Sequence, residues 1–444
     1  MQPWCRLAMV MAVVGASSVG FSQSLVGATS ATRPDAHKQL AEAQANAAKL
    51  QTAEGWKQVG VLESFFDPGG PYPAQPKGPP TRPANPNVFA FVDNERLVLA
   101  DGKNPIRIVE AKSGRVMSSF GEPLGNGLWG RKMVISHDGK YMVIVPSAAP
   151  EIWNLQTGKA IGELPKAEKT EYLDAVFLAD GKLAVLRSDV NGNRMKKSAV
   201  TIVLGPQGVT VSKEAVADIN AQSLMTAGKY LAVTATRSTQ VFEADTLEQV
   251  YTTDNSQYMI LFIHAEQVGA TLGVLRVTDV EERWTQMAPV LLQYTIPDGK
   301  ATKLEKFQFE ELQNNNPNDH RFQAFYTMSP DHTTLAVSRH GRVDCHRFTD
   351  GLRVQSIPFG DERDLPQVRF LSANRVLLTS ARHHQIAEFD IVQNVKLAVF
   401  PEDNVGAVSP DGKHFASRRD LVPVGENRYM NLPVPLVTLW ERTK

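Results

Sequence analysis

Short runs of alternating apolar and polar residues, separated by compact turns, follow one another from residue 87 to the end of the chain. Such alternation is typical of β-strands that bury one face. One class of turn recurs between these runs, as SHDGK at 136–140, LADGK at 178–182, TAGK at 226–229, SPDH at 329–332 and SPDGK at 409–413. Because Asp accepts local backbone hydrogen bonds and Gly permits a positive φ, each turn is expected to join two antiparallel strands.

A second class of turn alternates with the first, as in IWNLQTGKAIGEL, VFEADTLEQVYTT, LQYTIPDGKATKL, HRFTDGLRVQSI and EFDIVQNVKLAVF. Two alternating turn classes give four strands per unit. The units run over 87–122, 131–165, 172–215, 219–255, 257–309, 321–359, 365–401 and 404–444. A period of about 40 to 45 residues with four strands is typical of a β-propeller blade. We therefore expect an all-β, eight-bladed β-propeller, with seven blades as the alternative.

The segments ISHDGKYMVIVPSAAPEIWNLQTGKAIGEL and VSPDGKHFAS, followed later by VTLWER, resemble WD40-type propeller repeats. Most units lack the Gly-His and Trp-Asp pairs of that family. The chain is therefore similar to a degenerate WD40-like or YVTN-like family over nearly all of 87–444. This resemblance implies the fold and no particular function.

The last unit supplies three strands, near 404–408, 414–418 and 435–441, before the sequence ends. The segment WKQVGVLESF at 56–65 has the character of the outer strand that this unit lacks. We predict that 56–65 pairs beside 435–441 and closes the ring, which would protect an otherwise bare strand edge. A Pro-rich crossing at 66–86 would then lead to the first blade.

Residues 1–24 have the features of a secretory signal peptide: Arg6, an apolar run over 7–14 and small residues after it. A membrane anchor is the alternative, although the run falls short of the roughly 18 residues that spanning requires. Residues 32–55 follow, with Pro34 at a helix start and Gly55 as a stop, and predict a short amphipathic helix. We expect a periplasmic or secreted protein without a transmembrane segment after cleavage.

Composition adds few constraints on function. With 42% hydrophobic and 21% charged residues, the chain has enough apolar material for a large core. The 47 basic and 47 acidic residues become 46 against 47 once Arg6 is removed with the leader, so net charge does not favour nucleic-acid binding. Apart from Cys5 in the leader, Cys345 is the one cysteine, so no intramolecular disulfide can form and a buried, inert thiol is expected.

No hydrolase elbow, His-Glu-x-x-His, paired-Cys or EF-hand spacing occurs in the sequence. Thr157-Gly158 resembles the docking motif of quinone-dependent dehydrogenases but lacks the Trp that follows it there. The polar group His340, Asp344, Cys345 and His346, with His383-His384, has zinc-type side chains. Consecutive strand residues point to opposite faces, however, so we expect core and surface residues, with no metal, no cofactor and no catalysis.

Several second strands end in arginine. These are Arg187, Arg276, Arg339 and Arg419, and more loosely Arg237 and Arg382. Rotational repetition would place them in an arc suited to binding carboxylate, sulfate or phosphate groups. The alternative is that each arginine pairs with an acid of an adjacent blade and only holds the ring together.

The long connections are expected on the same face as these arginines. They are 188–198, 277–289, 310–320, 419–435 and 66–86, whereas the opposite face has only tight turns. Insertions in repeat folds gather on the binding face. The predicted contact surface is therefore Arg187, Arg276, Arg339, Arg382 and Arg419, with Arg283 and Trp284 on an exposed loop.

The sequence thus favours an exported, non-catalytic and monomeric scaffold that binds a protein or an anionic polymer. Two other functions stay open. One is a propeller enzyme or cofactor-binding protein of the quinoprotein kind that uses the central channel, and the other is a purely structural envelope component.

Overall fold

The computed structural model describes most of the chain from residue 52 onward. The described ranges are 52–63, 88–100, 104–122, 132–145, 150–164, 170–191, 194–205, 208–217, 221–235, 239–252, 258–265, 270–279, 287–298, 300–303, 306–307, 325–339, 341–361, 364–380, 384–400, 404–425 and 428–443. All regular secondary structure in these ranges is β-strand. No helix long and apolar enough to cross a membrane occurs among them.

The strands form eight antiparallel sheets, numbered here by chain order. The first strands are β3 (Val88–Phe91), β7 (Lys132–Ile135), β11 (Thr170–Phe177), β15 (Ala221–Ala227), β19 (Tyr258–Ala265), β23 (Phe325–Met328), β27 (Gln367–Ser372) and β31 (Asn404–Val408). The second strands are β4 (Arg96–Ala100), β8 (Tyr141–Val145), β12 (Leu183–Asn191), β16 (Tyr230–Ala235), β20 (Ala270–Asp279), β24 (Thr334–Arg339), β28 (Arg375–Ser380) and β32 (His414–Gly425).

The third strands are β5 (Ile106–Glu110), β9 (Glu151–Asn154), β13 (Arg194–Gly205), β17 (Thr239–Glu243), β21 (Met287–Ile296), β25 (Arg342–Arg347), β29 (Gln385–Asp390) and β33 (Arg428–Arg442). The fourth strands of sheets 1 to 7 are β6 (Val116–Phe120), β10 (Lys159–Glu163), β14 (Gly208–Ala217), β18 (Gln249–Thr252), β22 (Ala301–Lys303), β26 (Arg353–Pro358) and β30 (Val395–Phe400). Sheet 8 takes β2 (Trp56–Glu63) as its fourth strand, beside the short β1 (Thr52–Ala53).

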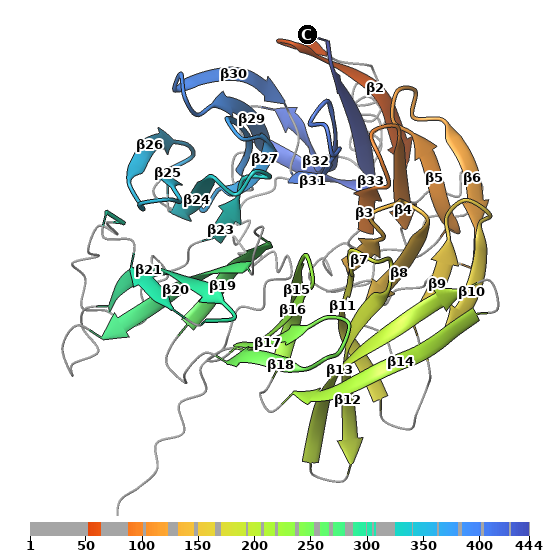
Figure 1. Cartoon of the computed structure of the whole chain (residues 1–444). Helices are drawn as coiled ribbons and strands as arrows, with labels where there is room; N and C mark the ends of the chain where they lie inside the picture. Colours follow the sequence, from red (N-terminus) through yellow and green to blue (C-terminus); the bar gives the residue numbers. More distant parts are fainter. Residues whose placement is uncertain are drawn as a thin grey trace, which may run out of the picture.

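The first strands lie innermost and the sheets are arranged around them (Figure 1). Each first strand contacts the first strand of the next sheet, and β31 of sheet 8 contacts β3 of sheet 1. Every predicted repeat unit contains one sheet, although sheet 3 extends beyond its predicted limits and runs from Thr170 to Ala217. The all-β prediction with four strands per unit is confirmed.

The predicted turns owe their shape to local hydrogen bonds. In the first-to-second turn of sheet 2, the Ser136 hydroxyl donates to Asp138 at 2.6 Å and accepts from the Tyr141 amide at 2.8 Å. Gly139 then adopts a φ of 65°. Sheet 6 has His332 at the corresponding position with a φ of 57°, so the Ser and Asp bonds hold this turn shape even without glycine.

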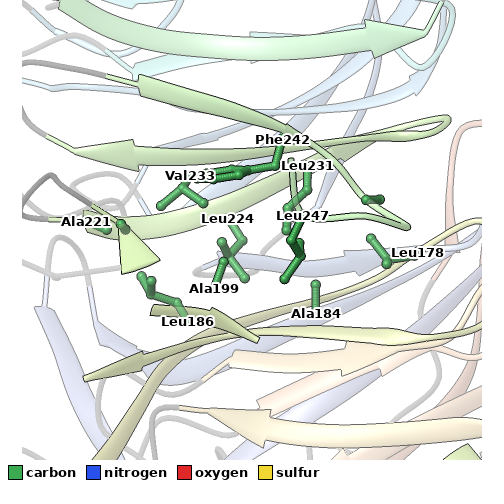
Figure 2. Packing of buried hydrophobic residues seen from close by; sticks show 12 residues of the cluster. Leu178, Ala184, Leu186, Ala199, Ala221, Leu224, Leu231, Val233, Phe242 and Leu247 are labelled. Atoms are coloured by element: carbon green, nitrogen blue, oxygen red, sulfur yellow. The ribbon is translucent and has the colours of Figure 1, made fainter. Parts of the chain in front are cut away.

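Neighbouring sheets pack face to face through side chains of their first, second and third strands. Figure 2 shows the layer between sheets 3 and 4, where Leu186 and Ala199 face Leu224, Leu231 and Phe242. Alternation along each strand supplies one such apolar face to each neighbour, which explains why the middle strands of the sheets are buried on both sides.

A buried carboxylate joins the inner strands of three successive sheets. Asp174 on β11 is 4% exposed and accepts a 2.8 Å hydrogen bond from the amide of Leu224 on β15. It also forms an ion pair with Lys132 on β7. A one-residue bulge beside Tyr172 interrupts the register of β11 next to Asp174.

The predicted pairing of 56–65 with 435–441 is confirmed over the described residues 56–63. β2 runs antiparallel to β33, from Trp56 opposite Arg442 to Glu63 opposite Leu436. Thr52 and Ala53, inside the predicted helical range 32–55, form strand β1 instead. Glu54 and Gly55 form the turn that follows β1, while residues 32–51, the signal peptide at 1–24 and the crossing at 66–86 lie outside the described residues.

Replacing Trp56 by Ala should lower the free energy of unfolding by about 3–5 kcal/mol, the usual cost of deleting a buried aromatic ring. Trp56 is 2% exposed, and its ring meets Phe415 edge-on at 5.0 Å. Urea unfolding would measure the change. Val116→Ala, at a site 44% exposed on β6, is the control and should have little effect. Equal midpoints for the two variants would contradict the role of β2.

Candidate functional site

The connections from second to third strands include three hairpins that extend past the rest of their sheets. Pairing of β12 with β13 continues to Asn191 opposite Arg194, whereas β14 ends opposite Lys197. Figure 1 shows this hairpin extending beyond its neighbours. The other two are β20–β21 in sheet 5 and β32–β33 in sheet 8. We call residues 190–196, 277–291 and 419–435 the arms.

The sequence predicted loops at 188–198, 277–289 and 419–435, and the structure corrects this in part. Most of these residues continue the strand pairing, out to Asp279 opposite Met287 in sheet 5 and Gly425 opposite Arg428 in sheet 8. Bulges beside Arg419 and Pro423 bend the arm of sheet 8. The fourth predicted loop, 310–320, lies outside the described residues.

Arg187 lies at the base of the arm of sheet 3 and is paired with two acids of its own sheet. Its Nε donates to Asp189 at 2.9 Å and its Nη2 donates to Glu214 at 2.7 Å. Burial alone would lower the pKa of Arg187, but the hydrogen bonds and charges of these carboxylates outweigh it and raise the pKa. Thr170 fixes the second oxygen of Asp189 at 2.7 Å.

Arg339 is likewise paired within its own sheet. It lies 3.4 Å from Asp344, a carboxylate that is 1% exposed and also has Arg342 at 3.3 Å and Arg353 at 3.9 Å. Ser356 donates a further 2.7 Å hydrogen bond to Asp344. Several donors therefore converge on one buried carboxylate.

The structure describes the remaining predicted contact residues to different extents. Arg419 is 6% exposed in β32. Arg276 lies in β20, opposite Tyr258 and Val290. Arg237, Arg283, Trp284 and Arg382 lie outside the described residues. The proposed contact surface therefore stays a prediction, while Arg187 and Arg339 show the ion pairing of the structural alternative, within a blade instead of between blades.

The group of potential metal ligands on β25 is packed in the core. Cys345 is 0% exposed, and burial raises its pKa to about 12. Burial lowers the pKa of His346, whose Nδ1 lies 3.1 Å from the Gly351 carbonyl and whose ring packs 4.7 Å from Phe307. Among the described residues, no group of three or more His, Cys, Asp or Glu is placed to hold a metal ion. His340 and His383 are outside that set.

Sequence reasoning missed a third buried carboxylate, Glu388 on β29. It is 2% exposed and accepts a 2.6 Å hydrogen bond from Trp56 Nε1 of sheet 8. Arg442 of β33 also pairs with it, and Arg375 of its own sheet lies at 3.4 Å. The signal was present in the sequence QIAEFD, because Glu388 stands inside a run of apolar strand residues that are buried on both faces.

No protein-family model matches this chain, and no curated protein matches it in sequence. Solved structures do resemble it. The computationally designed Ika8 protein is 12% identical with a TM-score of 0.54, over 81% of this chain and 96% of that one. The C-terminal WD40 domain of Sif2 is 11% identical with a TM-score of 0.52, over 88% and 99% of the two chains. The chain has an all-β fold of the propeller type.

Replacing Asp344 by Asn should lower the free energy of unfolding by about 3 kcal/mol, because it leaves buried and half-buried guanidinium groups without their carboxylate. This is the lower end of the usual range, since Arg342 and Arg353 keep 33% and 41% exposure. Asp350→Asn is the control, because Asp350 also pairs with two cations, Arg347 and Lys306, but at the surface. Thermal unfolding of the two variants should differ clearly, and equal losses would contradict the assignment.

Proposed function

We propose that this chain is an exported, non-catalytic β-propeller of eight blades, closed through β2, that serves as a scaffold for a protein partner. The observation that carries this proposal is the set of arms, which extend from second-to-third strand connections in sheets 3, 5 and 8. Second-to-third connections of all blades open on one face of a propeller, so one partner can meet more than one arm. Contact of β31 with β3 supports a closed ring.

The composition of the arms favours a protein over an anionic polymer. Arms 277–291 and 419–435 carry Trp284, Tyr429 and Met430, residue types that are enriched at protein interfaces. A two-stranded hairpin without a third strand or a packed face has little stability in water. Packing against a partner would add stability to such a hairpin.

The arginines support a polymer-binding role less well. A polyanion is held by cations that release counterions on binding. Arg187 is already neutralised by Asp189 and Glu214, and Arg339 by Asp344. An anionic polymer would have to displace these carboxylates, which costs more than binding at solvated lysines.

The export part of the proposal makes a direct prediction about mass. When the full sequence is produced in a bacterial host, protein recovered outside the cytoplasm should begin between about residues 20 and 32, because the signal peptide is cleaved after small residues. Intact-mass analysis would locate the new N-terminus. Uncleaved chain beginning at Met1 in the membrane fraction would contradict export.

The binding face can be tested by placing a photoreactive amino acid at Lys196 on the arm of sheet 3 and, as control, at Lys112 on a tight turn of sheet 1. The two side chains are similarly exposed, at 54% and 59%, and each lies in a long surface ion pair. Irradiation in the producing cells should give a discrete protein adduct from position 196 and none from 112. Adducts of equal yield at both positions would contradict an arm-side partner.

A shortened arm provides the second variant. Deleting Val190, Asn191, Arg194 and Met195 leaves Asp189 and Lys196, which are already paired, joined by Gly192-Asn193. The deletion keeps a two-residue connection and the inward and outward alternation of both strands. It should abolish the adduct made from a photoreactive residue at 196 while the melting temperature changes little. If position 196 gives no protein adduct and the chain is retained on an anionic resin, the partner would instead be an anionic polymer.

A further inference from the structure

Arg369 is a cation on an innermost strand, away from the arginines of the arm face. It lies in the middle of β27, directly opposite Leu377 on β28. Its chain neighbours Val368 and Phe370 are 5% and 8% exposed and pack in the layer shared with sheet 6. Leu377 packs with Val405 and Phe415 of sheet 8. Because directly opposed residues share a face, Arg369 lies on the side of β27 toward β31.

The Arg369 side chain is exposed, in contrast to both chain neighbours and to the fully buried Leu377 beside it. Even so, desolvation by the surrounding protein lowers its pKa, and no charged group contributes to that shift. Both observations hold for a side chain that water reaches but that protein encloses on several sides. The guanidinium stays protonated at neutral pH all the same.

The Arg369 side chain has no carboxylate partner among the described residues. Within that part of the chain it makes no ion pair and no side-chain hydrogen bond. The comparable cations are compensated: Lys132 on the inner strand β7 pairs with Asp174, and Arg187 pairs with Asp189 and Glu214. A cation without a carboxylate partner produces a positive potential that attracts anions.

The strands beside Arg369 contribute further donors. Among the described strands, β27 pairs only with β28 and β31 only with β32, so the inner edge of each carries main-chain N–H groups without a described strand partner. Every second residue of a strand directs its N–H to the same edge, and a sheet edge of this kind near a cation can bind an oxyanion. A guanidinium binds two oxygens of such a group at once, which lysine cannot do.

We propose that Arg369, with the inner edges of β27 and β31, forms a binding site for a small oxyanion on the inner rim of the propeller. The ligand class is a phosphate, sulfate or carboxylate group, either as a free ion or at the end of a partner's side chain. The site is independent of the arms, because it lies on the inner strands and makes no use of the long hairpins. One arginine with main-chain donors suits an affinity on the order of 1 mM.

Isothermal titration of the purified full chain with inorganic phosphate, sulfate and acetate, at constant ionic strength set with chloride, tests the site. Arg369→Gln should weaken phosphate binding at least tenfold. Lys396→Gln removes an exposed cation from β30 of the same sheet and should leave binding unchanged. Arg369→Lys keeps the charge but loses the bidentate geometry, so its phosphate affinity should lie between those of the other two variants.

The outcomes separate the ligand sources and can overturn the proposal. Binding of acetate but not of phosphate, lost in Arg369→Gln, assigns the site to carboxylate groups. Equal phosphate binding by wild type, Arg369→Gln and Lys396→Gln would show general ionic binding only and refute the site, as would no binding of any of the three anions. If Arg369→Gln does not fold, unchanged phosphate affinity in Arg369→Lys refutes the bidentate contact.

Discussion

The pairing of β2 with β33 is the interaction on which sheet 8 depends, and one carboxylate anchors it to sheet 7. Without β2, the long strand β33 would be an unpaired edge beside a core containing Phe400, Phe415 and Trp440. Glu388 of sheet 7 accepts a hydrogen bond from Trp56 on β2 and forms an ion pair with Arg442 on β33. A carboxylate that is 2% exposed is tolerated there because donors from three strands replace its hydration.

The same arrangement recurs at Asp174 and Asp344, so buried carboxylates with several donors are a structural feature of this fold. Asp174 holds the inner strands of sheets 2, 3 and 4 together, and Asp344 gathers arginines within sheet 6. Arg339, at the end of a second strand, is therefore part of this framework, whereas Arg187 is paired with the less buried Asp189 and Glu214. The proposal of a binding face rests on the arms, which are continued strand pairing and do not involve these buried carboxylates.

The repeat and its turns could be predicted from sequence because both depend on local chemistry. The Ser-Asp-Gly turns at 136–139 and 409–412 need only residues within five positions of one another. The arms could also have been predicted, since Asn191-Gly192-Asn193 is a tight-turn sequence flanked by strand residues, but polar composition suggested a loop. The bond from Trp56 to Glu388 spans 332 positions, and no local pattern specifies which buried glutamate meets which indole.

The two candidate sites differ in chemistry because their surroundings differ in compensation. At the base of the sheet 3 arm every described guanidinium contact is already made to a carboxylate, so net attraction for anions is weak and side-chain burial must supply the binding energy. On the inner rim, Arg369 is exposed and forms no ion pair with a described residue, so an anion would not have to displace a described carboxylate there. The packing of sheets 7 and 8 does not depend on the charge of Arg369, since Val368, Phe370 and Leu377 are buried apolar residues. Such a frame would allow the two proposed sites, the rim and the arms, to bind different ligands without one site requiring a change in the other.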